Sequence, residues 1–207
     1  MESAWRDARI ARIYEGTNEI NRMLSVGMLI KKAMKGQVDL LGPAMKVQEE
    51  LMGIPSFDTP DYSELFSEEK EMIGKLKKAF LMVAGGAIQK FGTDLEAHQQ
   101  LLMAAADILI EIYMAESTVL RTEKLAKKQG ENNVQEQIAM AKLYLYQAVD
   151  IVTQKGKEGI VSFAEGDEQR MMLMGLRRFT KYTNMPNVVG LREIITSKLV
   201  VENKYCF

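Results

Sequence analysis

Cysteine and histidine are almost missing from this sequence: Cys206 and His98 are the single examples in 207 residues. A lone cysteine cannot form an internal disulfide, which predicts a reducing compartment, and we expect the cytoplasm. One histidine excludes a di-iron bundle, which needs a Glu-x-x-His motif from each of two helices, and zinc is equally unsupported. We therefore expect no metal. Composition leaves a Ser–His–acid triad open, although the sequence has no Gly-x-Ser-x-Gly elbow.

An excess of one charge and long apolar runs are also lacking. The net charge of −1 gives no general attraction to nucleic acid or anionic lipid, so the basic cluster at 177–181 is predicted to be a solvated helix face. The most apolar window, 101–115, contains Asp107 and Glu111 and is too short to span a bilayer. Residues 1–12 are charged and lack the apolar segment of a secretory signal. We expect no nucleic-acid partner and no transmembrane segment.

What the sequence does contain is typical of an all-α protein. Only four residues are proline, 47% are hydrophobic, and alanine, leucine, methionine, glutamate and lysine are common. Apolar residues recur at helical spacing over 67–91, 94–128, 134–152 and 167–182, and the connections between these segments are short. This pattern predicts an antiparallel helical bundle. The 15 methionines are more typical of irregular helix interfaces than of a binding surface.

The clearest linker is the Pro- and Gly-containing stretch 53–61. We therefore expect residues 1–53 to form one unit, 54–66 to connect it, and 67–207 to form the bundle. In the first unit, an amphipathic helix over 18–35 should end at Gly36. Its expected inward positions are Ile20, Met23, Leu24, Met28 and Ala33.

Several polar residues are expected to mark helix starts. Thr93-Asp94-Leu95-Glu96 and Asn133-Val134-Gln135-Glu136 both match the capping-box pattern. Asp167 and Asn187 are further expected N-caps. Asp107 and Glu111 lie one turn apart and should form a thin polar stripe that faces solvent.

Glycine and proline are expected to shape the helices. Gly42-Pro43 should interrupt a helix over 38–52, because proline removes a backbone donor. Two glycines in the middle of a helix, Gly85-Gly86, predict that another helix crosses closely there. Gly156 and Gly159 should loosen the end of their helix.

The segment Arg6–Leu24 has the strongest local pattern. It is predicted to contain the end of one helix, a sharp break at Glu15-Gly16 and a second helix with Thr17 as its N-cap. Ile13 and Tyr14 precede Glu15, so its carboxylate is expected in an apolar corner. Such surroundings favour the protonated form of a carboxyl group, which suits a general acid or base.

This segment resembles the part of flavin-dependent acyl-CoA dehydrogenases that carries their catalytic glutamate. The matching residues are Arg6-Asp7-Ala8-Arg9-Ile10 and Tyr14-Glu15-Gly16-Thr17-Asn18-Glu19-Ile20. The helical remainder, including Ala115-Glu116-Ser117-Thr118-Val119-Leu120-Arg121-Thr122-Glu123-Lys124, resembles the C-terminal extension of the very-long-chain members. The resemblance therefore implies the last helices of a dehydrogenase C-terminal domain followed by an appended bundle.

The resemblance also implies roles for individual residues. Glu15 matches the base that removes the α-proton of a fatty acyl thioester, and its backbone N–H matches a donor to the thioester carbonyl. Thr17 and Glu19 match positions that bind FAD. At the position of Glu19, several members of the family carry glutamine. Tyr14 and Gly16 would line the thioester end of the substrate.

The resemblance predicts a C-terminal portion of a dehydrogenase that is inactive and binds no flavin without the N-terminal and middle domains. Acyl-CoA would be the substrate of the complete enzyme, and an electron-transfer flavoprotein would accept its electrons. The alternative is a non-catalytic helical module for dimerisation or protein interaction. Either interpretation leaves apolar surface on residues 18–36 uncovered, so we expect a homo-oligomer.

Overall fold

The computed structural model describes residues 2–53 and 61–207, and these ranges contain helices but no strand. The predicted all-α class is confirmed. The part of the predicted linker at 54–60 lies outside the described residues. The α-helices are α1 (Glu2–Ile10), α2 (Asn18–Met34), α3 (Leu41–Met52), α4 (Ser67–Phe91), α5 (Gln99–Gln129), α6 (Gln135–Phe163), α7 (Gly166–Phe179) and α8 (Val188–Glu202). Two short 3-10 helices, η1 (Gly92–Ala97) and η2 (Glu131–Asn133), come before α5 and α6.

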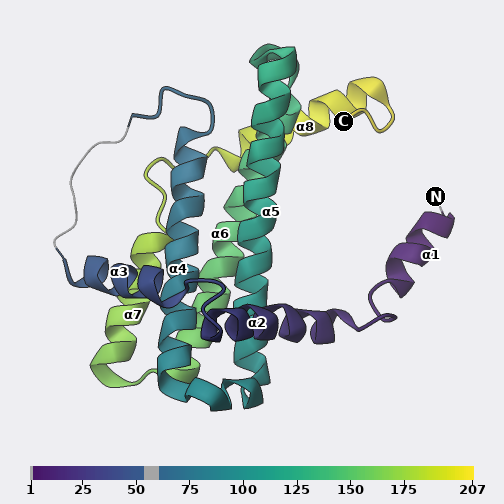
Figure 1. Cartoon of the computed structure of the whole chain (residues 1–207). Coiled ribbons are helices and arrows are strands. Elements are labelled where there is room, and N and C mark those ends of the chain that lie inside the picture. Colours follow the sequence, from purple (N-terminus) through teal and green to yellow (C-terminus); the bar gives the residue numbers. More distant parts are fainter. Residues whose placement is uncertain (1, 54–60) are drawn as a thin grey trace.

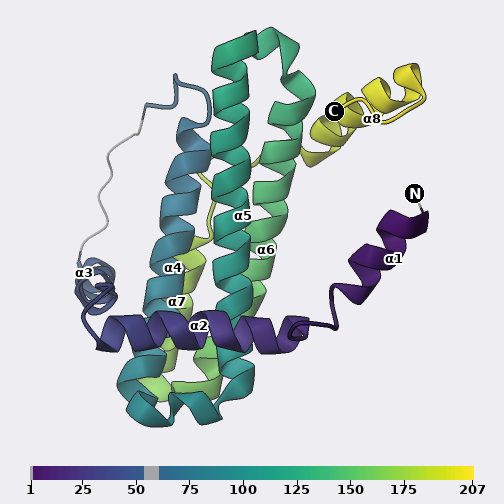
Figure 2. The same ribbon diagram turned by 45° about the vertical axis from the view of Figure 1, so that its right-hand side comes forward.

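The long helices α4, α5 and α6 run up and down beside one another, with α7 against α4 and α6 (Figures 1 and 2). The predicted antiparallel bundle is thus confirmed. The predicted seam of α6 is buried throughout: Val134, Ile138, Ala141, Leu145, Ala148 and Val152. Burial of such stripes is the main favourable contribution to folding, at about 25 cal/mol per Å² of apolar surface. None of the described helices is long and apolar enough to cross a membrane.

Helix α2 runs across the bundle against α5, and α3 packs on α4 (Figure 2). The inward face of α2 differs in part from the predicted one. Met23 and Ala33 are half-buried as expected, but Val26 is buried while Ile20, Leu24 and Met28 are exposed. A hydrogen-bonded ion pair explains the rotation: Arg22 Nε donates to Asp107 Oδ1 on α5 at 2.7 Å. The part of the predicted apolar stripe formed by Ile20, Leu24 and Met28 is therefore left uncovered.

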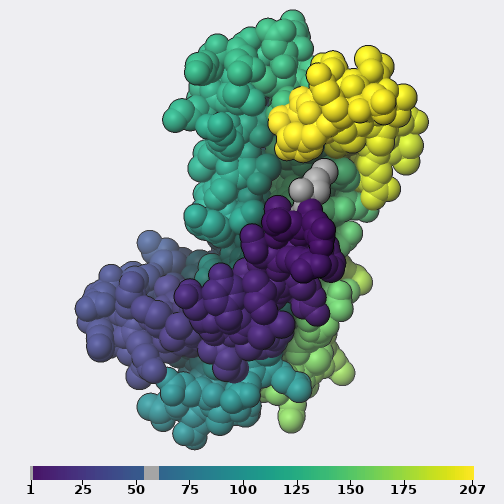
Figure 3. Space-filling model, turned by 90° about the vertical axis from the view of Figure 1, so that its right-hand side faces the viewer, coloured from purple at the N-terminus to yellow at the C-terminus, as the bar shows by residue number. Residues whose placement is uncertain are grey.

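The two ends of the chain project from the bundle. Neither α1 nor α8 contains a buried residue, although α8 contacts α6. Figure 3 shows the face of the molecule that carries α1, α2 and α8. Large exposed apolar side chains on this part of the chain include Trp5, Tyr14, Val200, Val201 and Tyr205.

Close helix contacts occur at glycines, as predicted for Gly85-Gly86. A Cβ on Gly85 would lie 3.0 Å from the Ala44 Cβ of α3, and one on Gly86 would lie 2.9 Å from the Phe163 ring. The prediction that Gly156 loosens α6 is wrong. A Cβ there would lie 2.7 Å from Leu176 Cδ1, so Gly156 lets α7 approach α6 closely.

Both capping-box predictions are wrong. Residues 93–96 form part of η1, which buries Leu95, and α5 begins only after His98 without a side-chain cap. The Asn133 amide donates to Gln129 O at 2.7 Å, which ties it to the preceding helix instead of the next. In both places a 3-10 turn satisfies backbone groups that the boxes were expected to satisfy.

The other predicted starts have mixed outcomes. Asn187 does cap α8, since its Oδ1 accepts from Gly190 N at 3.1 Å. Asp167 does not cap α7, which begins at Gly166 after Glu165, and it pairs with Arg170 instead. Gly42-Pro43 does not interrupt a helix. Proline lies in the first turn of α3, where its missing N–H costs nothing.

The predicted solvent-facing stripe on α5 is covered by two neighbouring helices. Asp107 meets Arg22 of α2, and Glu111 Oε2 accepts from the Tyr144 hydroxyl of α6 at 2.9 Å. The basic cluster 177–181 is also less solvated than predicted, because Arg178 Nη1 donates to Glu50 O at 3.3 Å. His98 stacks on Phe91 with ring centroids 3.7 Å apart, which is a structural role.

The Tyr144–Glu111 contact predicts alkaline sensitivity. Burial, followed by the hydrogen bond to Glu111, raises the pKa of Tyr144 to about 12. A tyrosine in the unfolded chain has a pKa of about 10, so between these values the unfolded state binds fewer protons. The free energy of unfolding should therefore fall as the pH rises through this window, and below it Tyr144 should contribute no pH dependence.

Tyrosinate absorbance and chemical unfolding measured across the window would check this expectation. Tyr144→Phe should make the decline less steep without abolishing it, because burial also raises the pKa of Tyr182. Tyr113→Phe, at an exposed position on the neighbouring α5, should leave the decline unchanged. An equal decline in the Tyr144→Phe variant and the parent would contradict it.

Candidate functional site

The predicted break between two helices is a well-defined turn. Helix α1 ends at Ile10, earlier than expected, and its carbonyl accepts from Ile13 N at 2.9 Å and Tyr14 N at 3.2 Å. The turn closes where Asn18 N donates to Arg12 O at 3.2 Å. We refer to residues 13–19 as the corner.

Two consecutive residues of the corner have left-handed backbone conformations. Glu15 has φ of 56° and Gly16 has φ of +95°. The Asn21 amide donates to Gly16 O at 2.8 Å, and a Cβ on Gly16 would lie 2.7 Å from Asn21 Oδ1. Position 16 therefore requires glycine for two separate reasons: its φ is positive and a side chain would meet Asn21.

The first turn of α2 completes the corner. Thr17 is the N-cap, as predicted, and its Oγ1 accepts from Ile20 N at 3.3 Å. Glu19 follows it, and a hydrogen bond from its own backbone N–H, then one from the Thr17 hydroxyl, lowers the pKa of its carboxyl group. Glu19 is therefore a stable carboxylate at the positive end of a helix.

The corner is open to solvent. Ile13 and Tyr14 are 54% and 55% exposed, and Glu15 is exposed beside them. The described residues thus do not form the apolar corner predicted around Glu15, because no other helix of the chain covers this turn. A carboxylate on a rigid, uncovered turn is free to meet a ligand or another polypeptide surface.

All five predicted site residues, Tyr14, Glu15, Gly16, Thr17 and Glu19, belong to this one turn. Sequence reasoning missed the residues that hold the turn in place. Asn21 bonds to Gly16, and Arg22 bonds to Asp107 and also donates to Asn18 O at 3.3 Å. The adjacent polar residues Asn21 and Arg22 in the first turns of α2 were the available signal. Among the described residues no cluster of three metal-ligating side chains occurs.

Gly16→Ala is expected to loosen the corner. The added Cβ meets Asn21, and a left-handed backbone costs an alanine about 1–2 kcal/mol. Amide hydrogen exchange at Ile20 and Asn21 should therefore quicken by about tenfold. Gly27→Ala is the control in the same helix. A Cβ there meets nothing within 4 Å, so this variant should slow exchange in α2, and unchanged exchange in Gly16→Ala would contradict the expectation.

Comparison with known proteins finds similarity in sequence and in fold to one family. The family model for the acyl-CoA dehydrogenase C-terminal domain matches residues 75–178. A Bacillus subtilis protein described as a probable acyl-CoA dehydrogenase is 37% identical over 205 residues, which is 99% of this chain and 34% of the relative.

A solved structure is similar over the whole chain. It is a Bacillus anthracis acyl-CoA dehydrogenase complexed with FAD, with 38% identity and a TM-score of 0.88 over all of this chain and 34% of that one. The chain thus spans about a third of the length of both relatives.

Proposed function

Since the chain belongs to the acyl-CoA dehydrogenase family, through the C-terminal domain matched over 75–178, we propose that it serves as the C-terminal third of a flavin-dependent dehydrogenase. The substrates would be fatty acyl-CoA thioesters, which lose hydrogen from the α and β carbons. The observation that carries the proposal is the corner. It presents Glu15 from a fixed left-handed turn at the place where the family resemblance puts the catalytic base.

The chemistry assigned to the corner follows from its groups. Glu15 takes the α-proton, and its backbone N–H donates to the thioester carbonyl, which stabilises the charge that develops on that oxygen. Gly16 has no side chain to obstruct the thioester. Tyr14 would line the same end of the substrate. When bound, FAD supplies the acceptor for the β-hydrogen. Water must be excluded from Glu15 by another polypeptide surface, because the described residues leave it exposed.

Thr17 and Glu19 fit a role in holding FAD. Thr17 is the half-buried N-cap of α2 and Glu19 is exposed in its first turn, where both can reach a bound molecule. The Thr17 hydroxyl can donate, and the ionised Glu19 can accept from an amino group such as that of adenine. A carboxylate beside a diphosphate would be repelled, so the adenine end is the better match for Glu19.

We further propose the division into 1–53, 54–66 and 67–207, cytoplasmic location, homo-oligomeric assembly and an electron-transfer flavoprotein as acceptor. The uncovered apolar stripe of α2 supports burial against either another domain or a second copy. Lack of cysteine pairs supports the reducing compartment.

A chimera tests the proposed activity. The chain would replace the matching C-terminal third of the Bacillus anthracis enzyme, to which it is similar over its full length. We expect the chimera to bind flavin and acyl-CoA to bleach the flavin absorbance, whereas the 207-residue chain alone should carry no flavin. Folded, flavin-loaded chimera that acyl-CoA cannot reduce would overturn the assignment, as would stoichiometric flavin on the chain alone.

The second candidate is a non-catalytic interaction module, favoured by the exposed apolar side chains of α1, α2 and α8. Sedimentation of the chain alone measures its self-association. Self-association that persists when Leu24 and Met28 are replaced by lysine, together with a chimera that cannot be reduced, would favour this candidate. Loss of self-association in the same variant would locate the contact on α2.

A further inference from the structure

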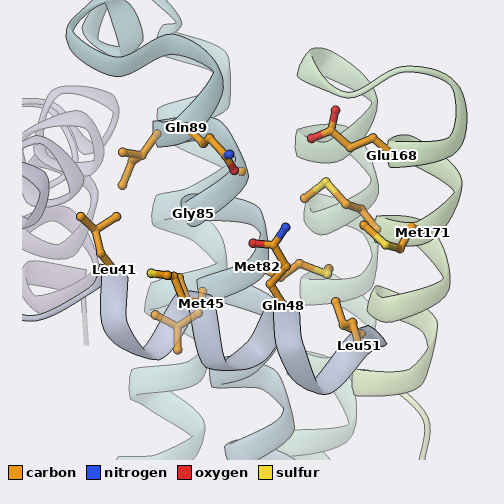
Figure 4. A pocket seen from close by; sticks show the side chains of 14 residues that line it. Leu41, Met45, Gln48, Leu51, Met82, Gly85, Gln89, Glu168 and Met171 are labelled. Atoms are coloured by element: carbon orange, nitrogen blue, oxygen red, sulfur yellow. The ribbon is translucent and has the colours of Figure 1, made fainter. Parts of the chain in front are cut away.

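A groove with a volume of about 560 Å³ lies between α3, α4 and α7, on a part of the molecule that the proposed reaction does not use. Figure 4 shows it from close by. Its walls are mainly apolar, and four of its side chains are methionines: Met45, Met82, Met171 and Met172. Its volume is in the range of about 300–1,000 Å³ that is usual for small-molecule sites.

The groove is formed by fixed contacts at both ends of α3. At one end Ala44 packs on Gly85, and at the other a Cβ on Gly175 would lie 2.8 Å from Leu51. Beside Leu51, Glu50 accepts from Lys78 Nζ at 2.7 and 2.9 Å. Because α3 is held to both α4 and α7, the space between them does not depend on a rearrangement.

The charge in the groove is confined to one end. Gln89 and Glu168 lie at the end away from α3 (Figure 4). Met82 and Leu51 lie close to α3, where the neutral amide of Gln48 also extends into the groove. Methionine is flexible and polarizable, so the walls can adapt to an apolar chain. Among the described residues that line the groove, Glu168 is the one that carries a charge.

We propose that this groove binds an unbranched aliphatic chain with an uncharged polar head group. The tail lies against Met82 and Leu51, and the head lies between Gln89 and Glu168. A hydroxyl or amide head can donate to the Glu168 carboxylate and bond to the Gln89 amide. A carboxylate head would face the like charge of Glu168, so alcohols and amides are selected over fatty acids.

The probe for this site is 1-decanol, added to the 207-residue chain with carbon-13-labelled methionine methyl groups. We expect saturable NMR shifts at the four groove methionines, and binding of decanoate that is weaker by about tenfold. Met45→Glu should weaken decanol binding by about tenfold, because an apolar tail must then pack beside a charge. Shifts that do not saturate, or that spread over all methionines, would overturn the proposal.

Matched controls separate the groove from the general surface. Met45 and Met52 belong to the same helix and are 62% and 69% exposed, but only Met45 lines the groove, so Met52→Glu should bind decanol normally. Met171→Glu and Met174→Glu form a second pair on α7, which is used if circular dichroism shows that Met45→Glu disturbs α3. If both variants of a correctly folded pair lost the same amount of decanol affinity, the proposed site would be refuted.

Glu168→Gln tests the head group. With the like charge removed, decanoate should bind within about threefold of decanol, while decanol affinity changes little. An unchanged preference for the alcohol would refute the placement of the head beside Glu168. Activity plays no part in these measurements, so the result is independent of the proposed dehydrogenase reaction.

Discussion

Replacing Glu15 by glutamine in the flavin-loaded chimera is expected to slow flavin reduction by acyl-CoA by about 10²–10⁴-fold, the usual contribution of a general base. Glutamine keeps the size and hydrogen-bonding capacity of the side chain but cannot take a proton. Its backbone N–H is retained, so binding of the thioester carbonyl should change little. Stopped-flow absorbance of the flavin separates the two effects, since reduction slows at saturating substrate while the substrate concentration at half-saturation stays similar.

Glu15→Gln should leave the fold intact because the side chain at position 15 is exposed. Glu15 makes none of the hydrogen bonds that define the corner, which come from Gly16, Thr17, Asn18 and Asn21. Thermal unfolding of the isolated chain should therefore be the same for Glu15→Gln and the parent. Glu49→Gln on the exposed side of α3 serves as the control and should reduce flavin normally. A Glu15→Gln chimera as active as the parent would remove this residue from the reaction.

Leu176→Ala is expected to destabilise the bundle by about 2–5 kcal/mol, as large-to-small substitutions in cores do. Leu176 is 1% exposed and fills the space where α7 passes Gly156 of α6. Removal of its branched end leaves a cavity between the two helices. Met174→Ala in the same helix, at a position that is 73% exposed, should change the free energy of unfolding by less than about 0.5 kcal/mol. Urea unfolding followed by circular dichroism measures both.

The same contact predicts that two destabilising changes partly cancel. Gly156→Ala alone places a Cβ 2.7 and 2.9 Å from the two methyl carbons of Leu176, so it should destabilise the bundle despite the better helix propensity of alanine. In the Leu176→Ala background those methyl groups are gone, and the new Cβ enters the cavity. The double variant should then be more stable than Leu176→Ala by up to about 1 kcal/mol. Strict additivity of the two changes would show that the helices do not touch there.

Most of the bundle could be predicted because burial in it follows the helical period. The seam from Val134 to Val152 is buried as its spacing indicates, and α4 has the bounds expected from its stripe. The corner could be predicted too, because Gly16 and the Thr17 cap are local signals over five residues. The groove could not, since the residues that line it come from three helices that are distant in sequence.

Failed predictions fall where local and tertiary forces compete. Each capping box offers hydrogen bonds worth about 1 kcal/mol, which is less than the burial of a side chain such as Leu95 contributes. The same competition determines which face of α2 packs on the bundle. The Arg22–Asp107 pair and the burial of Val26 stabilise the observed orientation more than burial of Ile20, Leu24 and Met28 would stabilise the predicted one. Gly156 was misread for a similar reason, because its neighbour Leu176 is twenty residues away in sequence.

The sequence by itself determined the all-helical class, the seams of the long helices and the turn at Gly16 with its Thr17 cap, because all three depend on residues within a few turns of one another. Only the tertiary structure decided which face of α2 points inward and that Asp107 and Glu111 of α5 are covered by Arg22 and Tyr144. It also decided that α3, α4 and α7 together line a mainly apolar groove. These features depend on pairs of side chains far apart along the chain. No periodicity specifies such pairs, and the packing of whole helices selects them.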